Sequence, residues 1–174
     1  MRSSIRLLLP ALLLSLAACE SSPGAKSPES KPHPLVGKRA PAVEGTAVPG
    51  SKQATLKYPG DVVVVDFWAT YCGPCVKEFP RLQAMADRFN GKVHVVAVSE
   101  DEDADLVPPF LTRTGVKFPV TWDKDKAIGN SYSVDSMPQT FVVDGKGVVR
   151  FVHRGYHAGE ADELEQQVKA LLAE

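Results

Sequence analysis

Two apolar runs near the middle of the chain predict two buried strands. Val62–Val65 opens a strand that we expect over Val62–Trp68, and a second strand is expected over Val93–Ser99. Both runs have the length and β-branched content of strands buried in a sheet. Between them, apolar residues at helical spacing predict an amphipathic helix from Cys75 to Asn90. This alternation of strand and helix indicates an α/β fold.

Shorter signals on either side complete the expected fold. The region 36–58 is rich in proline and glycine and predicts irregular structure with short strands. A helix is expected to start at Pro108 or Pro109 and to end before Gly115. The other expected elements are a strand over Lys117–Trp122, a short helix over Lys124–Tyr132, strands over Thr140–Asp144 and Val148–Val152 joined by a hairpin turn, and a final amphipathic helix over Ala161–Leu172.

Acidic residues interrupt this pattern in two places. Asp66 lies inside the first buried strand, where an unpaired charge is costly. The acidic run from Ser99 to Asp105 has the composition of a solvated helix start.

The strongest chemical signal is the sequence Cys72-Gly73-Pro74-Cys75, which stands between the first strand and its helix. A C-x-x-C pair in this context predicts a redox-active dithiol. Cys72 is expected at the helix N-terminus, where unpaired N–H groups and the helix dipole stabilise a thiolate. Cys75 follows one turn later and can close a disulfide with Cys72.

These residues resemble the active site of the thioredoxin superfamily, with Trp68 four residues before Cys72 and a helix proline at Pro80. The sequence Lys77-Glu78-Phe79-Pro80 is similar to the TlpA/ResA branch of extracytoplasmic thiol-disulfide oxidoreductases. The resemblance runs from about Val36 to the C-terminus. It implies a thioredoxin-like fold with a central mixed β-sheet flanked by helices, an N-terminal β-hairpin and an extra segment before a cis-proline loop at Met137–Pro138.

The resemblance also assigns roles to residues around the cysteines. Asp66 matches the buried acid of thioredoxin, which would have a raised pKa and would exchange a proton with the thiol of Cys75. Glu78 matches a glutamate near the active site of the TlpA/ResA branch. The alternatives are that Asp66 faces solvent at a strand end and that Glu78 is a solvated helix acid.

Partner binding is assigned to five residues. Trp68 matches a residue that packs under the active site, and Gly73 and Pro74 separate the two cysteines. Met137 precedes Pro138, and the resemblance implies that its backbone pairs with an extended substrate.

The start of the chain has the layout of a secretory leader over residues 1–18, with Arg2 and Arg6 before an apolar stretch. Leu16-Ala17-Ala18-Cys19 resembles a bacterial lipoprotein box, which implies a lipid on Cys19; the alternative is an ordinary signal peptide. Residues 19–35 have the composition of a disordered tether, in which we expect a solvated His33. A single folded domain is expected over residues 36–174.

Composition excludes some functions. The chain has three cysteines, so a lipid on Cys19 leaves one self-sufficient pair. Loss of the leader removes Arg2 and Arg6 and no acid, which changes the formal charge from −1 to −3 and offers no basic patch for nucleic acid. His153 and His157 are not at a helical spacing, so we expect no metal site with the thiols.

The sequence therefore predicts a lipid-anchored, periplasm-facing thiol-disulfide oxidoreductase that needs no cofactor beyond its cysteines. We expect a monomer that reduces disulfides of exported proteins, with apo-cytochrome c as one candidate, and that receives electrons from a membrane protein. Two alternatives stay open: a metal- or haem-handling lipoprotein that uses the thiols as ligands, and a disulfide donor or isomerase.

Overall fold

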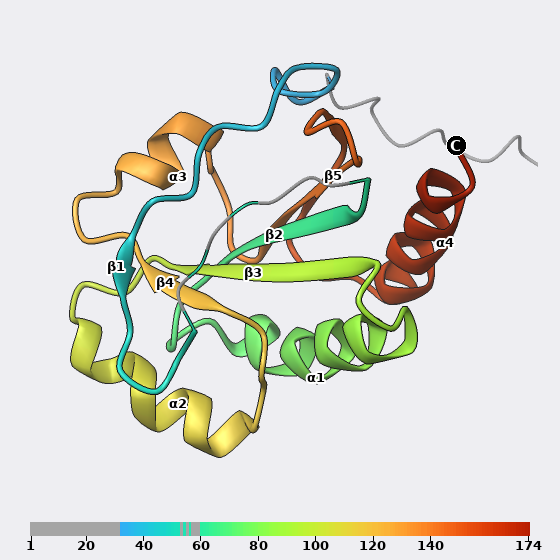
Figure 1. Cartoon of the computed structure of the whole chain (residues 1–174). Coiled ribbons are helices and arrows are strands. Elements are labelled where there is room, and N and C mark those ends of the chain that lie inside the picture. The colour runs from blue at the N-terminus through green and yellow to red at the C-terminus, as the bar shows by residue number, and fades with distance from the viewer. Residues whose placement is uncertain (1–31, 53, 55, 57–59) are drawn as a thin grey trace, which may run out of the picture. The chain divides into compact units, whose positions relative to one another are not determined.

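A six-stranded mixed sheet with helices on both faces forms the centre of the fold (Figure 1). The computed structural model describes residues 32–52, 54, 56 and 60–174, so the expected leader, Cys19 and most of the expected tether lie outside the described residues. In chain order the elements are β1 (Thr46–Ala47), β2 (Val62–Trp68), α1 (Gly73–Arg88), β3 (Val93–Ser99), a 3-10 turn (Ala104–Leu106), α2 (Val107–Thr114), β4 (Val120–Trp122), α3 (Ala127–Tyr132), β5 (Gln139–Val143), β6 (Val149–Arg154) and α4 (Glu160–Leu172).

The strands lie in the order β1-β4-β3-β2-β5-β6. The central strand β2 pairs with β3 in parallel and with β5 in antiparallel orientation. Strand β4 runs parallel to β3, whereas β6 is antiparallel to β5. The carboxyl ends of β2 and β3 therefore meet at the same edge of the sheet, directly before the two cysteines.

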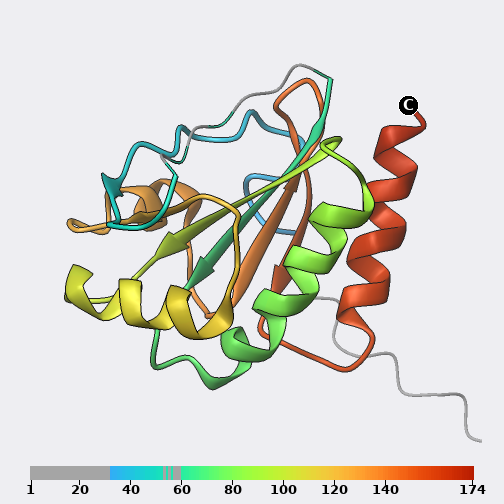
Figure 2. The same ribbon diagram turned by 60° about the horizontal axis from the view of Figure 1, so that its bottom comes forward.

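Side chains of β2 alternate between two hydrophobic cores, as the pleat of a strand requires. Val62, Val64 and Trp68 pack with residues of α1, α2 and α4 on one face, and Val63 and Val65 pack with α3 on the other. Figure 2 shows α1 and α4 side by side across the first face. The alternation places Asp66 on that face too, which is the face covered by the helix that follows Cys72.

The described residues of the N-terminal region do not form the expected β-hairpin. In place of a β-hairpin, the described residues form the two-residue strand β1, whose partner is β4, and a single bridge between Arg39 and Val148. Pro41 and Pro49 flank this region and lack the N–H groups that a longer ladder needs.

His33 is also not solvated. Its ring is buried edge-on against Phe141, with centroids 5.1 Å apart, and its Nδ1 accepts a hydrogen bond from Leu35 N. Burial lowers the pKa of His33. The packed part of the chain thus includes residues that composition alone assigned to the tether.

None of the helices formed by the described residues is long and apolar enough to cross a membrane.

Candidate active site

Cys72 and Cys75 form a disulfide at the N-terminus of α1. Cys72 is the N-cap residue, and its Sγ accepts a hydrogen bond from Cys75 N at 3.3 Å. The first turn of α1 contains no acid, so nothing there opposes stabilisation of a Cys72 thiolate by the helix dipole. Cys72 is 7% exposed whereas Cys75 is fully buried, so only Cys72 is open to attack from outside.

Two buried carboxyl groups lie behind the disulfide, and a single hydroxyl joins them. Oγ1 of Thr140 on β5 lies 3.0 Å from Oδ1 of Asp66 and 3.1 Å from Oε1 of Glu78. Thr140 is the cross-strand partner of Asp66, and Glu78 lies one turn after Cys75 on α1. The prediction that Asp66 is buried is confirmed, and Glu78 is buried as well, so neither is a solvated acid.

Burial raises the pKa of both carboxyl groups. For Asp66, desolvation is the main cause and the charge of Glu160 adds to it, whereas the hydrogen bond from Thr140 acts in the opposite direction. For Glu78, desolvation is again the main cause, followed by the charges of Asp66 and Glu160. One oxygen of each group, Asp66 Oδ2 and Glu78 Oε2, is buried without a hydrogen-bond partner among the described residues.

The geometry around Thr140 fits a pair that shares one proton. A hydroxyl carries one hydrogen, so it donates to one carboxylate at a time. The second contact is a hydrogen bond only if the other carboxyl group is protonated and donates to Oγ1. Two charged carboxylates in this position would also repel each other strongly.

Glu78 has a route to solvent. It lines a cavity of about 540 Å³ between α1 and α4, together with Arg81, Tyr156 and Glu160. The buried pair can therefore exchange protons with the outside through Glu78.

Aromatic side chains form the floor beneath the disulfide. The ring of Trp68 packs against Phe79 of α1 and Phe110 of α2, with both centroid distances 4.6 Å. Trp68 is fully buried, in the same core as both cysteines. Because Trp68 is buried, it does not contact a partner directly, and its assignment to partner binding is wrong in that respect. The side chain packs beneath the site instead.

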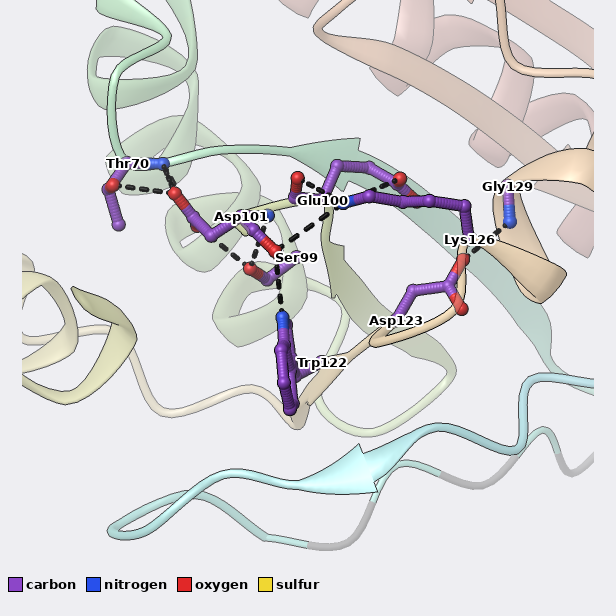
Figure 3. Close-up of polar contacts among 8 residues, drawn as sticks. All are labelled: Thr70, Ser99, Glu100, Asp101, Trp122, Asp123, Lys126 and Gly129. Atoms are coloured by element: carbon purple, nitrogen blue, oxygen red, sulfur yellow. Dashed lines mark hydrogen bonds and ion pairs between the residues drawn. The ribbon is translucent and has the colours of Figure 1, made fainter. Parts of the chain in front are cut away.

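A further buried acid, Asp101, holds the loop that leads into the cysteines (Figure 3). Its carboxylate accepts hydrogen bonds from Thr70 N, from the Thr70 hydroxyl at 2.6 Å and from the Ser99 hydroxyl. Its own carbonyl oxygen accepts from Trp122 Nε1 at 2.8 Å. Asp101 is buried, so interpreting the whole acidic run as solvated was wrong for this residue.

The position of Asp101 in the strand order could have predicted that it lies near the cysteine loop. It follows β3 at the sheet edge where β2 ends, and polar residues that follow neighbouring parallel strands lie close together. Sequence spacing alone carried no such signal, because 31 residues separate Thr70 from Asp101.

The cis-proline loop lies beside this edge. The Met137–Pro138 peptide bond is cis, as predicted. Gln139 is buried, and its Oε1 accepts hydrogen bonds from the backbone N–H groups of Asp135 and Ser136, which orders the loop. Met137 packs at the edge of the core that contains the cysteines.

A shallow pocket lies beside this loop. It is lined by Tyr71, Met137, Glu100 and Lys126, among others. Glu100 and Lys126 form an ion pair at 3.4 Å. Burial raises the pKa of Glu100 to about 7, although the charge of Lys126 opposes the shift. Tyr71, Gly73 and Pro74 are exposed around Cys72.

Comparison with known proteins identifies the family. The Redoxin family model matches residues 35–168. The chain is 35% identical to the thiol-disulfide oxidoreductase ResA of Bacillus thuringiensis over 115 residues, which is 66% of each chain. It is 33% identical to the thioredoxin-like protein YneN of Bacillus subtilis over 76% of this chain and 78% of that protein.

A solved structure from Chlorobium tepidum, described as a thiol:disulfide interchange protein DsbE, has a TM-score of 0.71 and 32% identity. The alignment covers 79% of this chain and 97% of that one. The predicted thioredoxin-like fold is confirmed. The chain therefore belongs to the Redoxin family, among the thioredoxin-like thiol-disulfide oxidoreductases.

Proposed function

We propose that this protein exchanges disulfides with exported proteins through Cys72 and Cys75 and acts as a reductant. The observation that carries the proposal is the disulfide at the N-terminus of α1, backed by the buried pair Asp66 and Glu78. Relatives named as thiol-disulfide oxidoreductases support it.

The first step uses the accessible cysteine of the reduced protein. The Cys72 thiolate attacks one sulfur of a partner disulfide; a Cys72–partner bond forms, the partner's S–S bond breaks and a partner thiolate leaves. The free N–H groups of the first turn of α1 and the helix dipole stabilise the attacking thiolate.

The second step needs a base in a buried site. The Cys75 thiol must lose its proton before it attacks Cys72 Sγ, and a buried thiol does not ionise readily. The ionised member of the Asp66–Glu78 pair accepts that proton. Cys75 then closes the Cys72–Cys75 disulfide and the partner leaves with its second sulfur reduced, so two electrons have passed to the partner.

The partner surface surrounds Cys72. Gly73 and Pro74 are exposed beside it, and Met137 offers backbone groups from the cis-proline loop. An extended segment that carries a disulfide would pair with this loop, with one side chain near Tyr71 and Glu100. Such segments are available in unfolded exported proteins, and apo-cytochrome c is one candidate by resemblance to the TlpA/ResA branch.

The reducing direction rests on Gly73 and Pro74, which resemble the spacer of reducing members of the superfamily. Sustained reduction outside the cytosol requires an electron donor, for which we propose a membrane protein that relays electrons by thiol exchange. The cysteine pair needs no added cofactor for this chemistry.

We also propose that Cys19 carries a lipid that anchors a periplasm-facing monomer to a membrane. Metabolic labelling with a fatty acid tests this: the wild type and Cys72→Ser should be labelled, and Cys19→Ser should not. Equal labelling of Cys19→Ser would refute the anchor.

Trapping of mixed disulfides tests the exchange itself. Cys75→Ser should accumulate disulfide-linked adducts with unfolded, disulfide-containing proteins, because the resolving step is blocked. Cys72→Ser should form none. Adducts in equal amounts from both variants would contradict the assigned order of attack.

A further inference from the structure

Three metal-ligating side chains converge where β6 leads into α4, the labelled C-terminal helix of Figure 1. His153 lies near the end of β6, His157 lies in the connecting loop and Glu160 is the first residue of α4. One ligand atom from each lies within 4.8 Å of the other two. His153 is 7% exposed and Glu160 is 4% exposed, whereas His157 faces solvent.

Hydrogen bonds fix the orientation of the His153 ring. The amide of Gln167 donates through Nε2 to Glu163, so its Oε1 is the atom that faces His153. That oxygen lies 2.8 Å from His153 Nε2, which is therefore a protonated ring nitrogen. With Nε2 as the donor, Nδ1 is the nitrogen that the neutral form of the ring offers to a metal ion.

Nδ1 faces the carboxylate of Glu160. Nδ1 of His153 lies 3.9 Å from Oε1 of Glu160, which is too far for a hydrogen bond. Two ligand atoms on one tetrahedral zinc ion, each about 2.0–2.1 Å from the metal, are about 3.3 Å apart. A cation between the two atoms would satisfy both with a small movement.

The loop holds the third ligand nearby. His157 N donates to Glu160 Oε2 at 3.2 Å, and Glu160 N donates to the His157 carbonyl oxygen. Gly155, with φ +69°, makes the turn that brings the loop back over β6. Nδ1 of the exposed His157 ring lies 3.2 Å from the Ala158 carbonyl oxygen, so Nδ1 is the donor and Nε2 is the nitrogen available to a metal ion.

Local charge also favours a cation. Glu160 is close enough to Asp66 and Glu78 to act on both electrostatically. Within the described part of the chain, none of these three buried carboxyl groups has a lysine or arginine at ion-pair distance, although the more distant charge of Arg81 acts on Glu78. Buried charges of one sign are costly without a counter-charge.

We propose that His153, His157 and Glu160 bind one divalent transition-metal ion of the zinc type. Two imidazoles and one carboxylate form a donor set that suits zinc, and the contact from His153 to Gln167 is the outer-shell hydrogen bond that metal-binding histidines make. The thiols are not ligands. The site is separate from the disulfide exchange proposed above and does not depend on it.

Titration of the oxidised full-length protein with zinc chloride tests the site, because the disulfide removes both active-site thiols from competition. Calorimetry on chelator-treated protein should give one zinc ion per chain. His157→Gln should weaken binding at least tenfold without a change in fold, because this side chain is exposed. His153→Gln should do the same, and Gln167→Leu should weaken binding roughly 10–100-fold by releasing the His153 ring.

His94→Gln is the matched control, since His94 is an exposed strand histidine that pairs with Asp61 on another side of the sheet. It should bind zinc like the wild type. Absence of saturable binding by the oxidised wild type, unchanged affinity in both His157→Gln and His153→Gln, or an equal loss in His94→Gln would each overturn the proposal.

Discussion

The hydroxyl of Thr140 lies 3.0 Å from Oδ1 of Asp66, its cross-strand partner, and also reaches Glu78. This contact joins a strand of the sheet to the helix that carries the cysteines. It keeps two carboxyl groups together in a buried site, where ionising both of them would cost much free energy. This pair is the base that we propose for the Cys75 thiol.

The pair should make stability fall as pH rises. Asp66 has a pKa of about 7 in the folded protein against 3.8 in the unfolded chain, so between these values the folded state holds a proton that the unfolded state releases. The stability that protonated Asp66 contributes is fully present at acid pH and is lost as the pH rises to about 7. Glu78, with a pKa of about 9, extends this decline to higher pH. Denaturant unfolding of the oxidised protein from pH 4 to pH 9 should show this slope.

Asp66→Asn should reduce the slope between pH 4 and pH 7 and leave the part that Glu78 contributes. At pH 8 it should raise the unfolding free energy by on the order of 2–4 kcal/mol, because a buried charge is removed. Asp125→Asn, a change of an exposed aspartate, should leave the slope unchanged. Identical slopes for Asp66→Asn and the wild type would show that Asp66 does not hold the proton.

Thr140→Val should raise the pKa of both acids further, because the hydrogen bond from Thr140 lowers each of them. The base that accepts the Cys75 proton is then less available at neutral pH. We expect disulfide exchange at pH 7 to slow by roughly three- to tenfold and its pH profile to move to higher pH, since one pKa unit is a factor of ten.

Thr140→Ser keeps the hydroxyl and should keep the wild-type pH profile. A slower Thr140→Val with an unshifted profile would indicate a packing effect and would contradict the assigned role.

Asp101→Ala should loosen the loop before the cysteines. It leaves the half-buried N–H and hydroxyl of Thr70 without their acceptor, which should lower the unfolding free energy by about 1–3 kcal/mol. Hydrogen exchange at the Thr70 amide should become faster. Glu102→Ala, next to it but exposed, should change stability by less than about 0.5 kcal/mol. Similar effects from both substitutions would remove the special role of Asp101.

Phe110→Ala should open a cavity under the disulfide. Phe110 packs on Trp68 and Phe79, so its loss should cost about 3–5 kcal/mol of stability. Leu106→Ala, a change of an exposed apolar residue just before α2, should cost much less. Thermal unfolding of the two variants measures the difference, and equal melting temperatures would contradict this packing.

Short sequence patterns predicted the strand bounds and helix ends that depend on neighbouring residues. The β-branched runs give β2 and β3 the bounds expected from the sequence, and Gly115 ends α2 in the left-handed conformation, as a C-terminal glycine does. The start of α1 at the cysteines followed from the Cys72 motif. These features depend on neighbours a few residues apart.

Two of the errors come from contacts between distant segments. His33 is buried because Phe141, more than a hundred residues away, offers a ring to pack on, and Asp101 is buried because Thr70 needs an acceptor. The meeting of Glu160 with His153 and His157 depends on a loop path that composition does not reveal. The leader and the lipid on Cys19 stay predictions, because they lie outside the described residues.

The reduction potential of the Cys72–Cys75 couple tests the central claim most directly. The oxidised protein is equilibrated against defined thiol buffers and the fraction reduced is measured at each. A reductant should have a two-electron couple near that of thioredoxin, roughly −270 mV. A value near roughly −120 mV, as in a strong oxidant, would contradict the direction proposed here, and the absence of any couple would contradict the redox function itself.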